Sequence, residues 1–453
     1  MSTIAAISTG QAAGGIGIVR ISGENALSVA DRIFKSVSGI NLNKLKGYTA
    51  AFGKVYSDGE EIDEAVALVF RAPKSYTGED VVEISCHGGL LVTKQLLRAA
   101  LANGAVPAEP GEFTKRAFLN GKMDLTSAES VMNIISAKSE QAKSAALNTL
   151  DGALYKKISE ISLSLKKIAA QMAAWVDYPD DEIEDLSDEN LTNVLKSNKT
   201  ELEELISRFD IGQAIIEGVE TAIIGRPNVG KSALMNMLTG FEKSIVTSVA
   251  GTTRDIVEET VVLGGTVLRL ADTAGLHETE DTVEKIGVDR TRQKTGRALL
   301  ILAVFDSSEE LNAEDGEIFK LCEGKNAVAV INKTDLDSKI DYEKIKTHFK
   351  NIVLISAKEQ KGIKELEKEI ENALGTDSFD TTAATLMNER QFSCCKLACD
   401  SINEALEALQ IGITRDAINV SIDSAIESLD VLTGEKATES VVNEIFSQFC
   451  VGK

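Results

Sequence analysis

Gly225-Arg226-Pro227-Asn228-Val229-Gly230-Lys231-Ser232 is the stretch that decides how this chain folds. It reads G-x-x-x-x-G-K-S and lies between an apolar run at 221–224 and a helix-compatible run at 233–238. A strand, a glycine-rich loop and a helix in this order form a phosphate-binding loop, whose backbone N–H groups and helix N-terminus attract a polyphosphate. We therefore expect Lys231 to contact the β- and γ-phosphates of a nucleotide and the Ser232 hydroxyl to bind Mg²⁺.

Two later segments match the parts of a GTPase that sense the γ-phosphate. Gly251-Thr252-Thr253-Arg254-Asp255 has the spacing of a switch segment, and Thr253 is the candidate for a second hydroxyl on Mg²⁺. Asp272-Thr273-Ala274-Gly275 follows a predicted strand at 268–271. Asp272 is placed to hold Mg²⁺ through water, and the Gly275 N–H to contact the γ-phosphate.

Asn332-Lys333-Thr334-Asp335, directly after an apolar run at 328–331, indicates which base is bound. A carboxylate at Asp335 can accept from both N1–H and the 2-amine of guanine, whereas adenine offers an acceptor at N1 and no 2-amine. Ser356-Ala357-Lys358 follows the apolar run 352–355, and its backbone can donate to the guanine carbonyl. Five elements in this order predict a GTP-binding domain.

Leu276 departs from the usual GTPase pattern, because Ras-like enzymes carry there a Gln that orients the attacking water. Glu284 is our candidate for that role, although a surface carboxylate is the interpretation that spacing alone favours. Hydrolysis also needs another source of positive charge. The amide oxygen of Asn228 points towards the β/γ bridge in this loop geometry and could ligate a monovalent cation, with a plain loop residue as the alternative.

Composition places the chain among soluble globular proteins. Its 453 residues suffice for about three domains, 43% of them are hydrophobic, and the net charge of −22 argues against broad non-specific nucleic-acid binding. Six scattered cysteines suit a reducing cytoplasm better than a disulfide framework. We expect no signal peptide and no membrane span, since no apolar run approaches about 18 residues.

The remaining segments suggest further domains around the GTP-binding block. Residues 1–117 resemble an α+β unit, with strands at 16–21, 65–70 and 81–85 and helices at 25–34 and 90–102. Helical patterns at 126–209 and 380–450 flank the strand–helix alternation of 213–376, which is typical of a doubly wound parallel sheet. This predicts that the α/β block is inserted into a helical domain. One helix face is expected from Leu147, Leu150, Leu154 and Ile158.

Polar groups gather at the predicted strand ends of the first unit. Arg20 closes one strand and His87 follows another, where a capped turn is its plainer interpretation. Glu83 lies among apolar residues, so it either faces solvent or must meet a hydrogen-bond donor. In the second helical segment, Cys394, Cys395 and Cys399 predict buried thiols rather than a metal site.

The chain resembles the MnmE (TrmE) family of bacterial tRNA-modification GTPases over essentially its whole length. The segments that carry this resemblance are Gly-Gly-Ile-Gly-Ile-Val-Arg-Ile-Ser-Gly (14–23), Ser-Tyr-Thr-Gly-Glu-Asp-Val-Val-Glu (75–83), His-Gly-Gly (87–89), Pro-Gly-Glu-Phe-Thr-Lys-Arg-Ala-Phe-Leu-Asn-Gly-Lys-Met-Asp-Leu (110–125), the GTPase motifs and Phe-Cys-Val-Gly-Lys (449–453). His277 departs from the arginine associated with many members.

The resemblance implies a multi-domain architecture and a partnership. It implies an N-terminal tetrahydrofolate-binding and dimerisation domain at 1–117, a helical domain from 118–212 and 378–453, and an α/β Ras-like GTPase domain at 213–377. It further implies a homodimer that forms a heterotetramer with the FAD-dependent MnmG. The complex would add an aminomethyl or carboxymethylaminomethyl group at carbon 5 of the wobble uridine of certain tRNAs. The carbon would come from 5-formyl- or methylene-tetrahydrofolate.

The resemblance also implies site residues. Folate would be bound by Arg20, Glu83, Lys122 and Lys453, and Cys450 is a possible functional thiol. Mg²⁺ would be bound by Ser232 and Thr253, and K⁺ by Asn228, Thr247, Val249 and Thr252, with Glu284 positioning water. The residues expected at GTP are Asn228, Val229, Gly230, Lys231, Ser232, Ala233, Thr247, Ser248, Val249, Ala250, Gly251, Thr252, Thr253, Asp272, Thr273, Ala274, Gly275, Asn332, Lys333, Asp335, Ser356, Ala357 and Lys358.

Two other functions remain open from the sequence. A ribosome-assembly or RNA-chaperoning GTPase of the Era or EngA kind would share the GTPase block, but it would carry a basic RNA-binding module after that block. Residues 380–453 show no such module. The other alternative is a nucleotide-dependent scaffold in which the folate is only structural.

Overall fold

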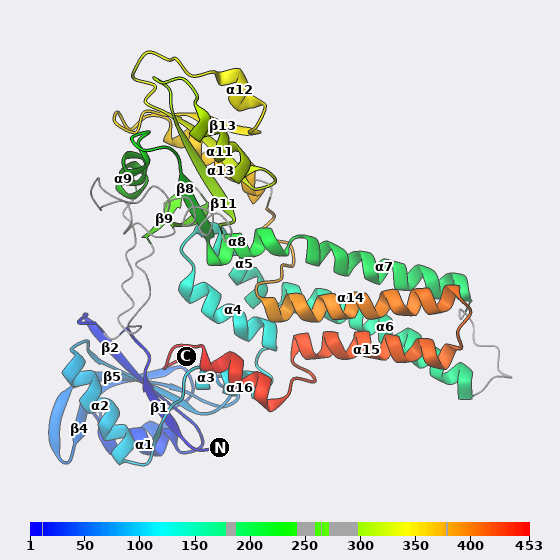
Figure 1. Ribbon diagram of the computed structural model, residues 1–453. Helices are drawn as coiled ribbons and strands as arrows, with labels where there is room; N and C mark the ends of the chain where they lie inside the picture. The colour runs from blue at the N-terminus through cyan, green and yellow to red at the C-terminus, as the bar shows by residue number, and fades with distance from the viewer. Residues whose placement is uncertain (11, 178–186, 242–258, 264, 271–297, 377–378) are drawn as a thin grey trace. The chain divides into compact units, whose positions relative to one another are not determined.

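The structure, a computed structural model, describes residues 1–453 except 11, 178–186, 242–258, 264, 271–297 and 377–378 (Figure 1). The described chain forms two units. Unit one comprises Met1–Met132, Leu150–Leu195 and Asp400–Lys453. Unit two comprises Asn133–Thr149 and Lys196–Cys399.

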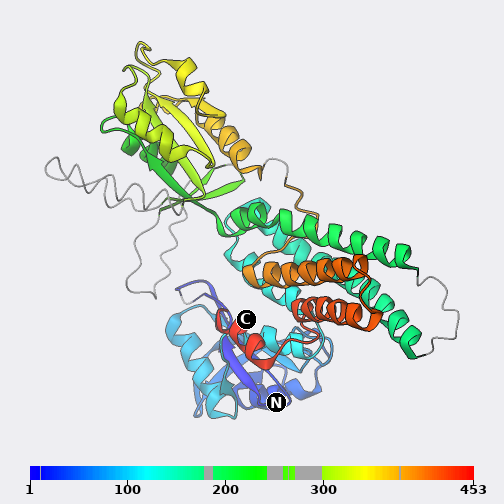
Figure 2. The same cartoon turned by 45° about the vertical axis from the view of Figure 1, so that its right-hand side comes forward.

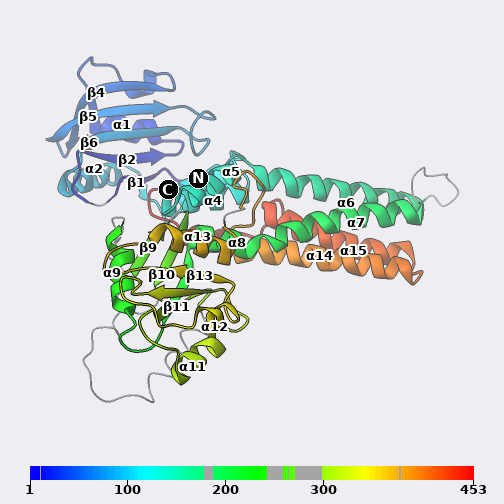
Figure 3. The ribbon, with the colours of Figure 1, turned by 90° about the horizontal axis from the view of Figure 1, so that it is seen from above.

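Unit one contains a seven-stranded sheet of order β3-β4-β5-β6-β2-β1-β7. Its strands are β1 (Ile4–Ile7), β2 (Ile16–Ser22), β3 (Phe34–Ser36), β4 (Thr49–Ser57), β5 (Glu60–Phe70), β6 (Val81–His87) and β7 (Val106–Pro107). All neighbours are antiparallel except the β1–β7 pair. The helices α1 (Ala26–Ile33) and α2 (Leu90–Ala102) pack against it, and a 3₁₀ turn spans Leu42–Lys44 (Figure 3).

Alternation along β2 and β6 gives the sheet two different faces. Val19 and Ile84 are fully buried in the core beneath α1 and α2. Their neighbours Arg20 and Glu83 pair in register and therefore point to the opposite face. The strands predicted at 16–21 and 81–85 thus place a charged pair on the face away from these two helices.

The helical part of unit one contains α3 (Glu112–Leu119), α6 (Ala153–Asp177), α15 (Arg415–Thr433) and α16 (Glu439–Ser447), with portions of α4 (Leu125–Ser136), α7 (Asp188–Ser207) and α14 (Glu389–Gln410). α6 and α15 lie side by side (Figure 2). The buried Asp430 of α15 accepts from Ser162 Oγ at 3.1 Å and from Lys166 Nζ at 2.9 Å, both on α6. A charged hydrogen bond therefore joins these two helices inside the apolar packing.

One helix expected from the sequence is two helices. The predicted face ran from Leu147 to Ile158, but α5 (Glu140–Leu150) ends before Gly152, and α6 begins after it. Gly152 has φ +88°, a left-handed conformation that commonly ends a helix. The prediction of one continuous apolar face was therefore wrong, and Leu147 is 41% exposed.

Unit two contains a six-stranded sheet of order β13-β12-β11-β8-β10-β9. Its strands are β8 (Val219–Ile224), β9 (Glu259–Leu263), β10 (Thr266–Leu270), β11 (Leu300–Asp306), β12 (Ala327–Asn332) and β13 (Asn351–Leu354). Five strands are parallel as predicted, whereas β9 pairs antiparallel with β10 at the edge. The buried strands are continuous apolar runs because both faces are covered.

Helices cover both faces of this sheet. α8 (Phe209–Glu217), α9 (Lys231–Phe241) and α13 (Ile363–Leu374) contribute to the core on one face. α11 (Ala313–Cys322) and α12 (Tyr342–Lys346) contribute to the core on the other. Helices α4 to α7 precede the sheet and α14 to α16 follow it, which confirms the fold class of an α/β block inserted into helical sequence.

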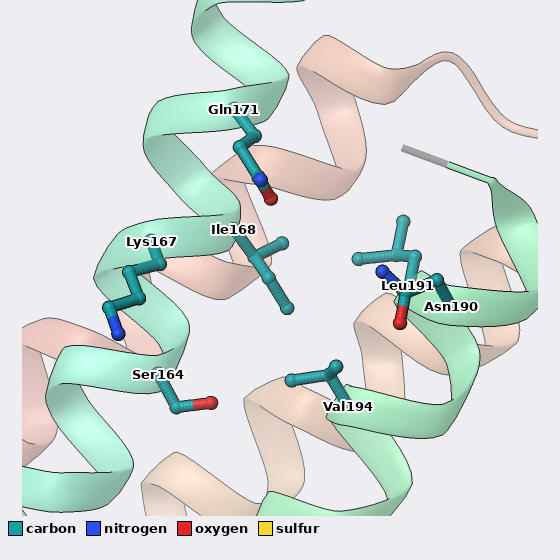
Figure 4. Close-up of a pocket in the computed structure, with 7 residues that line it drawn as sticks. All are labelled: Ser164, Lys167, Ile168, Gln171, Asn190, Leu191 and Val194. Carbon is teal, nitrogen blue, oxygen red and sulfur yellow. The ribbon is translucent and has the colours of Figure 1, made fainter. Parts of the chain in front are cut away.

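A hollow of about 190 Å³ lies between α6 and α7 in unit one (Figure 4). Ile168, Leu191 and Val194 form its apolar part, and Ser164, Lys167, Gln171 and Asn190 its polar part.

In the part of the chain that the structure describes, no helix is long and apolar enough to span a membrane. Cys394, Cys395 and Cys399 are buried in α14 as predicted, and burial raises the pKa of the Cys395 thiol.

Asp430→Ala should destabilise unit one. It removes the acceptor shared by Ser162 and Lys166, and a hydrogen bond to a charged group contributes about 1.5–3 kcal/mol. Urea unfolding followed by circular dichroism should show a loss of that order. Glu435→Ala is the control: Glu435 also contacts Lys166, at 3.4 Å, but it is 51% exposed and should change the free energy of unfolding by less than about 0.5 kcal/mol. Equal effects of the two substitutions would contradict the interpretation.

Candidate functional site

The phosphate-binding loop connects β8 to α9 and needs backbone conformations that few residues adopt. Gly225, Asn228 and Gly230 have φ of +157°, +64° and +101°. A Cβ on Gly230 would lie 2.2 Å from Nδ2 of Asn332, and one on Gly225 would lie 2.5 Å from the carbonyl oxygen of Val304. Both glycines are therefore required by close approach as well as by φ.

Lys231 begins α9, and its ammonium group lies against the loop. Its Nζ donates to the carbonyl oxygens of Gly225 at 2.8 Å and Arg226 at 2.6 Å. Burial lowers the pKa of Lys231. Ser232 and Ala233 follow in the first turn of α9 and are exposed, as is Asn228. The loop therefore presents a cation, a hydroxyl and a helix N-terminus together.

Asn332, the last residue of β12, joins the phosphate-binding loop to the segment after β13. Its Nδ2 donates to the carbonyl oxygen of Val229 at 3.0 Å, and its Oδ1 accepts from the backbone N–H of Ala357 at 3.0 Å. Asn332 is 2% exposed, so both bonds are made in a site without competing solvent. These bonds fix the separation of the two loops.

Asp335 is held beside the same segment. Ser356 Oγ donates to Asp335 Oδ1 at 2.7 Å, and Ser356 Oγ in turn accepts from the N–H of Glu359 at 3.2 Å. The hydrogen bond from the Ser356 hydroxyl is the main reason that the pKa of Asp335 is lowered. Lys358 is exposed and adds an attractive charge. Hydrogen bonds thus bring together four residues that the sequence predicts at the nucleotide: Asn332, Asp335, Ser356 and Ala357.

Asp306 is a residue of this site that sequence reasoning missed. It ends β11, is 2% exposed, and forms an ion pair with Nζ of Lys333. Ser308 donates to its Oδ1 through N–H at 2.9 Å and through Oγ at 2.7 Å. Burial alone would raise the pKa of Asp306, but the bonds from Lys333 and Ser308 outweigh burial and lower it. The available signal was an acidic residue directly after the apolar run 300–305.

Many predicted nucleotide contacts lie outside the described residues. These are Thr247, Ser248, Val249, Ala250, Gly251, Thr252, Thr253, Asp272, Thr273, Ala274, Gly275 and Glu284, together with Leu276 and His277. Of the predicted K⁺ and Mg²⁺ ligands, the structure describes Asn228 and Ser232. Among described residues, no group of three or more His, Cys, Asp or Glu could hold a metal ion.

A second group of predicted site residues meets in unit one. Arg20 Nε donates to Glu83 Oε1 at 2.8 Å, so Glu83 finds the donor that its apolar neighbours required. The Arg20 guanidinium lies 5.4 Å from the ring centroids of both Tyr76 and Phe113. Burial raises the pKa of Tyr76. The Arg20 guanidinium is thus held by the carboxylate of Glu83 and by the two aromatic rings.

The segment that ends at Lys453 reaches this pair. Arg20 Nη1 donates to the carbonyl oxygen of Gly452 at 3.3 Å, and Ser8 Oγ donates to the same oxygen at 3.2 Å. Gly452 has φ +98°, and a Cβ there would lie 2.3 Å from the carbonyl oxygen of Ile7. The N–H of Phe113 donates to the main-chain oxygen of Lys453 at 3.2 Å. The residue before Lys453 therefore contacts Arg20, and the main chain of Lys453 contacts Phe113.

The other two predicted residues of this region have different surroundings. Lys122 Nζ donates to the carbonyl oxygen of Pro73 at 3.1 Å, and no described contact joins Lys122 to Arg20 or Glu83. The carbonyl oxygen of Cys450 accepts from the N–H of Gly111 at 3.4 Å, while Cys450 itself is exposed. His87 ends β6 with its Nδ1 2.8 Å from Asp63 Oδ1.

The fold and the site together define a P-loop GTPase domain joined to an α+β unit and helices. The model of the GTP-binding protein TrmE N-terminus matches residues 3–122, and the model of the MnmE helical domain matches residues 125–450. Proteins named tRNA modification GTPase MnmE align with 100% of the chain: it is 41% identical to that of Bacillus velezensis, 40% to that of Bacillus subtilis and 42% to that of Lactococcus lactis. The alignments cover 100%, 100% and 98% of those proteins. This chain belongs to the MnmE family of tRNA modification GTPases.

Solved structures with parts similar to this chain include the G domain of an iron transporter and Era. The G domain of the T. maritima FeoB iron transporter is 27% identical, with a TM-score of 0.26, and the match covers 34% of this chain and 98% of that one. Era from Aquifex aeolicus is 28% identical, with a TM-score of 0.27, and the match covers 40% of this chain and 66% of that one.

Asp306→Asn should weaken guanine-nucleotide binding about tenfold, or roughly 1.4 kcal/mol. The reason is that Lys333, within the predicted base-binding segment 332–335, loses its charged partner. Titration with a fluorescent GDP analogue measures this. Ser308→Ala is the control, since it removes one bond to Asp306 and keeps the ion pair.

The pH dependence of this ion pair has a definite sign. The lowered pKa of Asp306 means that its contribution is fully present above the ordinary pKa of an aspartate and is lost only as pH falls through the folded value. The affinity ratio of wild type to Asp306→Asn should therefore be constant from about pH 8 to about pH 5. A ratio that falls towards unity within that range would contradict the ion-pair role.

Proposed function

We propose that this protein hydrolyses GTP in the service of tRNA modification, acting with the FAD-dependent MnmG to modify carbon 5 of the wobble uridine. The observation that carries the proposal is the full-length similarity to proteins named tRNA modification GTPase MnmE. We assign folate binding and dimerisation to residues 1–117, the helical domain to 118–212 and 378–453, and the GTPase domain to 213–377. The cytoplasm is the proposed location.

In the nucleotide site, each described residue receives a role that its chemistry supports. Lys231 binds the β- and γ-phosphates with the N–H groups of residues 228–233, and Ser232 offers its hydroxyl to Mg²⁺. Asp335 accepts from N1–H and the 2-amine of guanine, and the Ala357 backbone lies near the guanine carbonyl. Asn332 hydrogen-bonds both the phosphate-binding loop and the segment after β13, which supports a nucleotide contacting both.

The metal ions are assigned by residue chemistry. The exposed Ser232 in the first turn of α9 fits Mg²⁺, which prefers oxygen ligands, with Thr253 as its predicted companion. Asn228, exposed and at φ +64° in the loop, fits an oxygen ligand of K⁺ with Thr247, Val249 and Thr252. A bound K⁺ would supply positive charge near the bridging phosphate oxygen. Glu284 is the proposed group for positioning water, because Leu276 cannot hydrogen-bond.

The folate assignment is supported by the Arg20–Glu83 pair. A pterin ring presents an amide and amine edge that a carboxylate such as Glu83 can accept from, and Arg20 holds that carboxylate in one orientation. The anionic glutamate tail of folate suits Lys122 and Lys453. A tetrahydrofolate derivative bound there would supply the one-carbon unit. The exposed Cys450 precedes Lys453 closely in the sequence.

The homodimer is supported by apolar side chains on the face of the sheet away from α1 and α2. Phe52 on β4 pairs in register with Val66 on β5, and these side chains are 54% and 40% exposed. Ile16 on β2 is 65% exposed. Exposed apolar groups gathered on one face are typical of a protein–protein interface.

A nucleoside profile tests the proposed function. In a strain that lacks this protein, mass spectrometry of tRNA nucleosides should show loss of the carbon-5 substituent of the wobble uridine, with recovery on re-expression. Re-expression of Lys231→Ala should fail to restore it, because phosphate binding is lost. An unchanged profile in the deletion strain, with a defect in ribosome assembly instead, would support the Era-like alternative and overturn the proposal.

Asn228→Ala tests the K⁺ site. Removal of the amide oxygen should abolish the difference between K⁺ and Na⁺ in GTP turnover, while GTP affinity changes little because Lys231 and the loop N–H groups remain. The measurement is steady-state GTP hydrolysis in the two chloride salts. Gln171→Ala, which also removes an amide but lies on α6, is a control that should retain the salt difference. Persistent K⁺ stimulation in Asn228→Ala rules out this ligand.

A further inference from the structure

Arg226, inside the phosphate-binding loop, lies near two carboxylates from the region after β11. Its Nε lies 2.9 Å from Oδ1 of Asp315, and its Nη2 lies 3.4 Å from Oε2 of Glu309. The Asp315 side chain is fully buried and that of Arg226 is 10% exposed, whereas that of Glu309 is 60% exposed. The Nε–Oδ1 contact lacks hydrogen-bond alignment, so charge attraction in a buried place holds it.

Asp315 is itself fixed by the first turn of α11. Its Oδ2 accepts from the N–H of Asn312 at 2.9 Å, while Asn312 Oδ1 accepts from the N–H groups of Glu314 and Asp315 at 2.9 and 3.3 Å. This is a capping box, in which the first residue and the third turn residue satisfy each other's backbone donors. The carboxylate that meets Arg226 therefore has a position set by helix geometry.

The backbone of Arg226 extends this chain of contacts to the lysine. The carbonyl oxygen of Arg226 accepts from Lys231 Nζ at 2.6 Å, and that of Gly225 does so at 2.8 Å. The peptide that carries the Arg226 side chain thus also carries an acceptor for the ammonium group. A shift of Arg226 would move the surface against which Lys231 rests.

We propose that Asp315, acting through Arg226, is a positioning residue for the phosphate-binding lysine. Asp315 is fully buried and so does not itself reach a nucleotide; it sets where the loop holds Lys231. Glu309 contributes little, since an exposed pair is screened by solvent. The inference goes beyond GTP hydrolysis as such, and it rests on the proposed role of Lys231 in phosphate binding.

Asp315→Asn in the full chain tests the proposal, because the Asn carbonyl can still accept from the N–H of Asn312 while the charge that anchors Arg226 is removed. GDP and GTP affinities, measured with fluorescent analogues, should both fall at least about tenfold. Two controls should stay within about twofold: Glu309→Gln removes the exposed partner, and Asn312→Ala weakens the α11 cap without removing the Arg226 pair. Arg226→Gln should reproduce the loss if Asp315→Asn does not fold.

Introducing Asp315→Asn into the Lys231→Ala variant separates positioning of the lysine from general stabilisation of the phosphate-binding loop. If Asp315 acts through the lysine, adding Asp315→Asn to Lys231→Ala should cause less than about a twofold further loss. A full tenfold further loss, an unchanged affinity in folded Asp315→Asn, or an equal loss in Asn312→Ala would each overturn the proposal. If Lys231→Ala alone left nucleotide affinity unchanged, the phosphate-binding assignment of Lys231 would fail instead.

Discussion

The nucleotide site depends on the side-chain amide of Asn332, which donates to the phosphate-binding loop and accepts from the segment after β13. Both partners are backbone groups, so the amide fixes the two loops and not merely two side chains. Buried hydrogen bonds of this kind are costly to leave unmade. The close approach of Gly230, where a Cβ would lie 2.2 Å from the same amide, shows how tightly this contact constrains the loop.

The parallel sheet explains why these groups meet. β8, β11, β12 and β13 are parallel neighbours, so the residues that follow them gather at one edge of the sheet. The loop after β8 brings Lys231, the end of β11 brings Asp306, and the end of β12 brings Asn332. Charges that are far apart in sequence thereby pair, as Lys333 does with Asp306. The residues that we propose for phosphate and base binding then lie at the same edge of one sheet.

Sequence reasoning predicted a phosphate-binding loop and base-binding segments because each is a short local pattern with its own backbone requirement, and the structure joins the described parts of them through Asn332. Asp306 and Asp315 were missed because their roles come from partners far along the chain, Lys333 and Arg226. The break at Gly152 was missed because apolar spacing continued across it, while one left-handed residue ended the helix. Long-range pairing and single backbone conformations leave little trace in residue periodicity.

The second site illustrates the same limit. Strand register brings Arg20 beside Glu83, whereas the sequence indicated only that Glu83 would need a donor if it did not face solvent. Gly452, 432 residues from Arg20, was not predicted as its acceptor, because a main-chain carbonyl has no sequence signal. A glycine is needed at position 452 because the backbone is left-handed there and approaches Ile7 closely.

The proposed guanine nucleotide is held between the loop at Lys231 and the carboxylate at Asp335. The most direct test is the relative affinity of guanine and xanthine nucleotides for wild type and for Asp335→Asn, measured by titration. Xanthine carries a carbonyl at position 2, so the amide donor of the variant should favour it and the preference should reverse. A variant that still binds GDP more tightly than the xanthine nucleotide would contradict this account of base recognition.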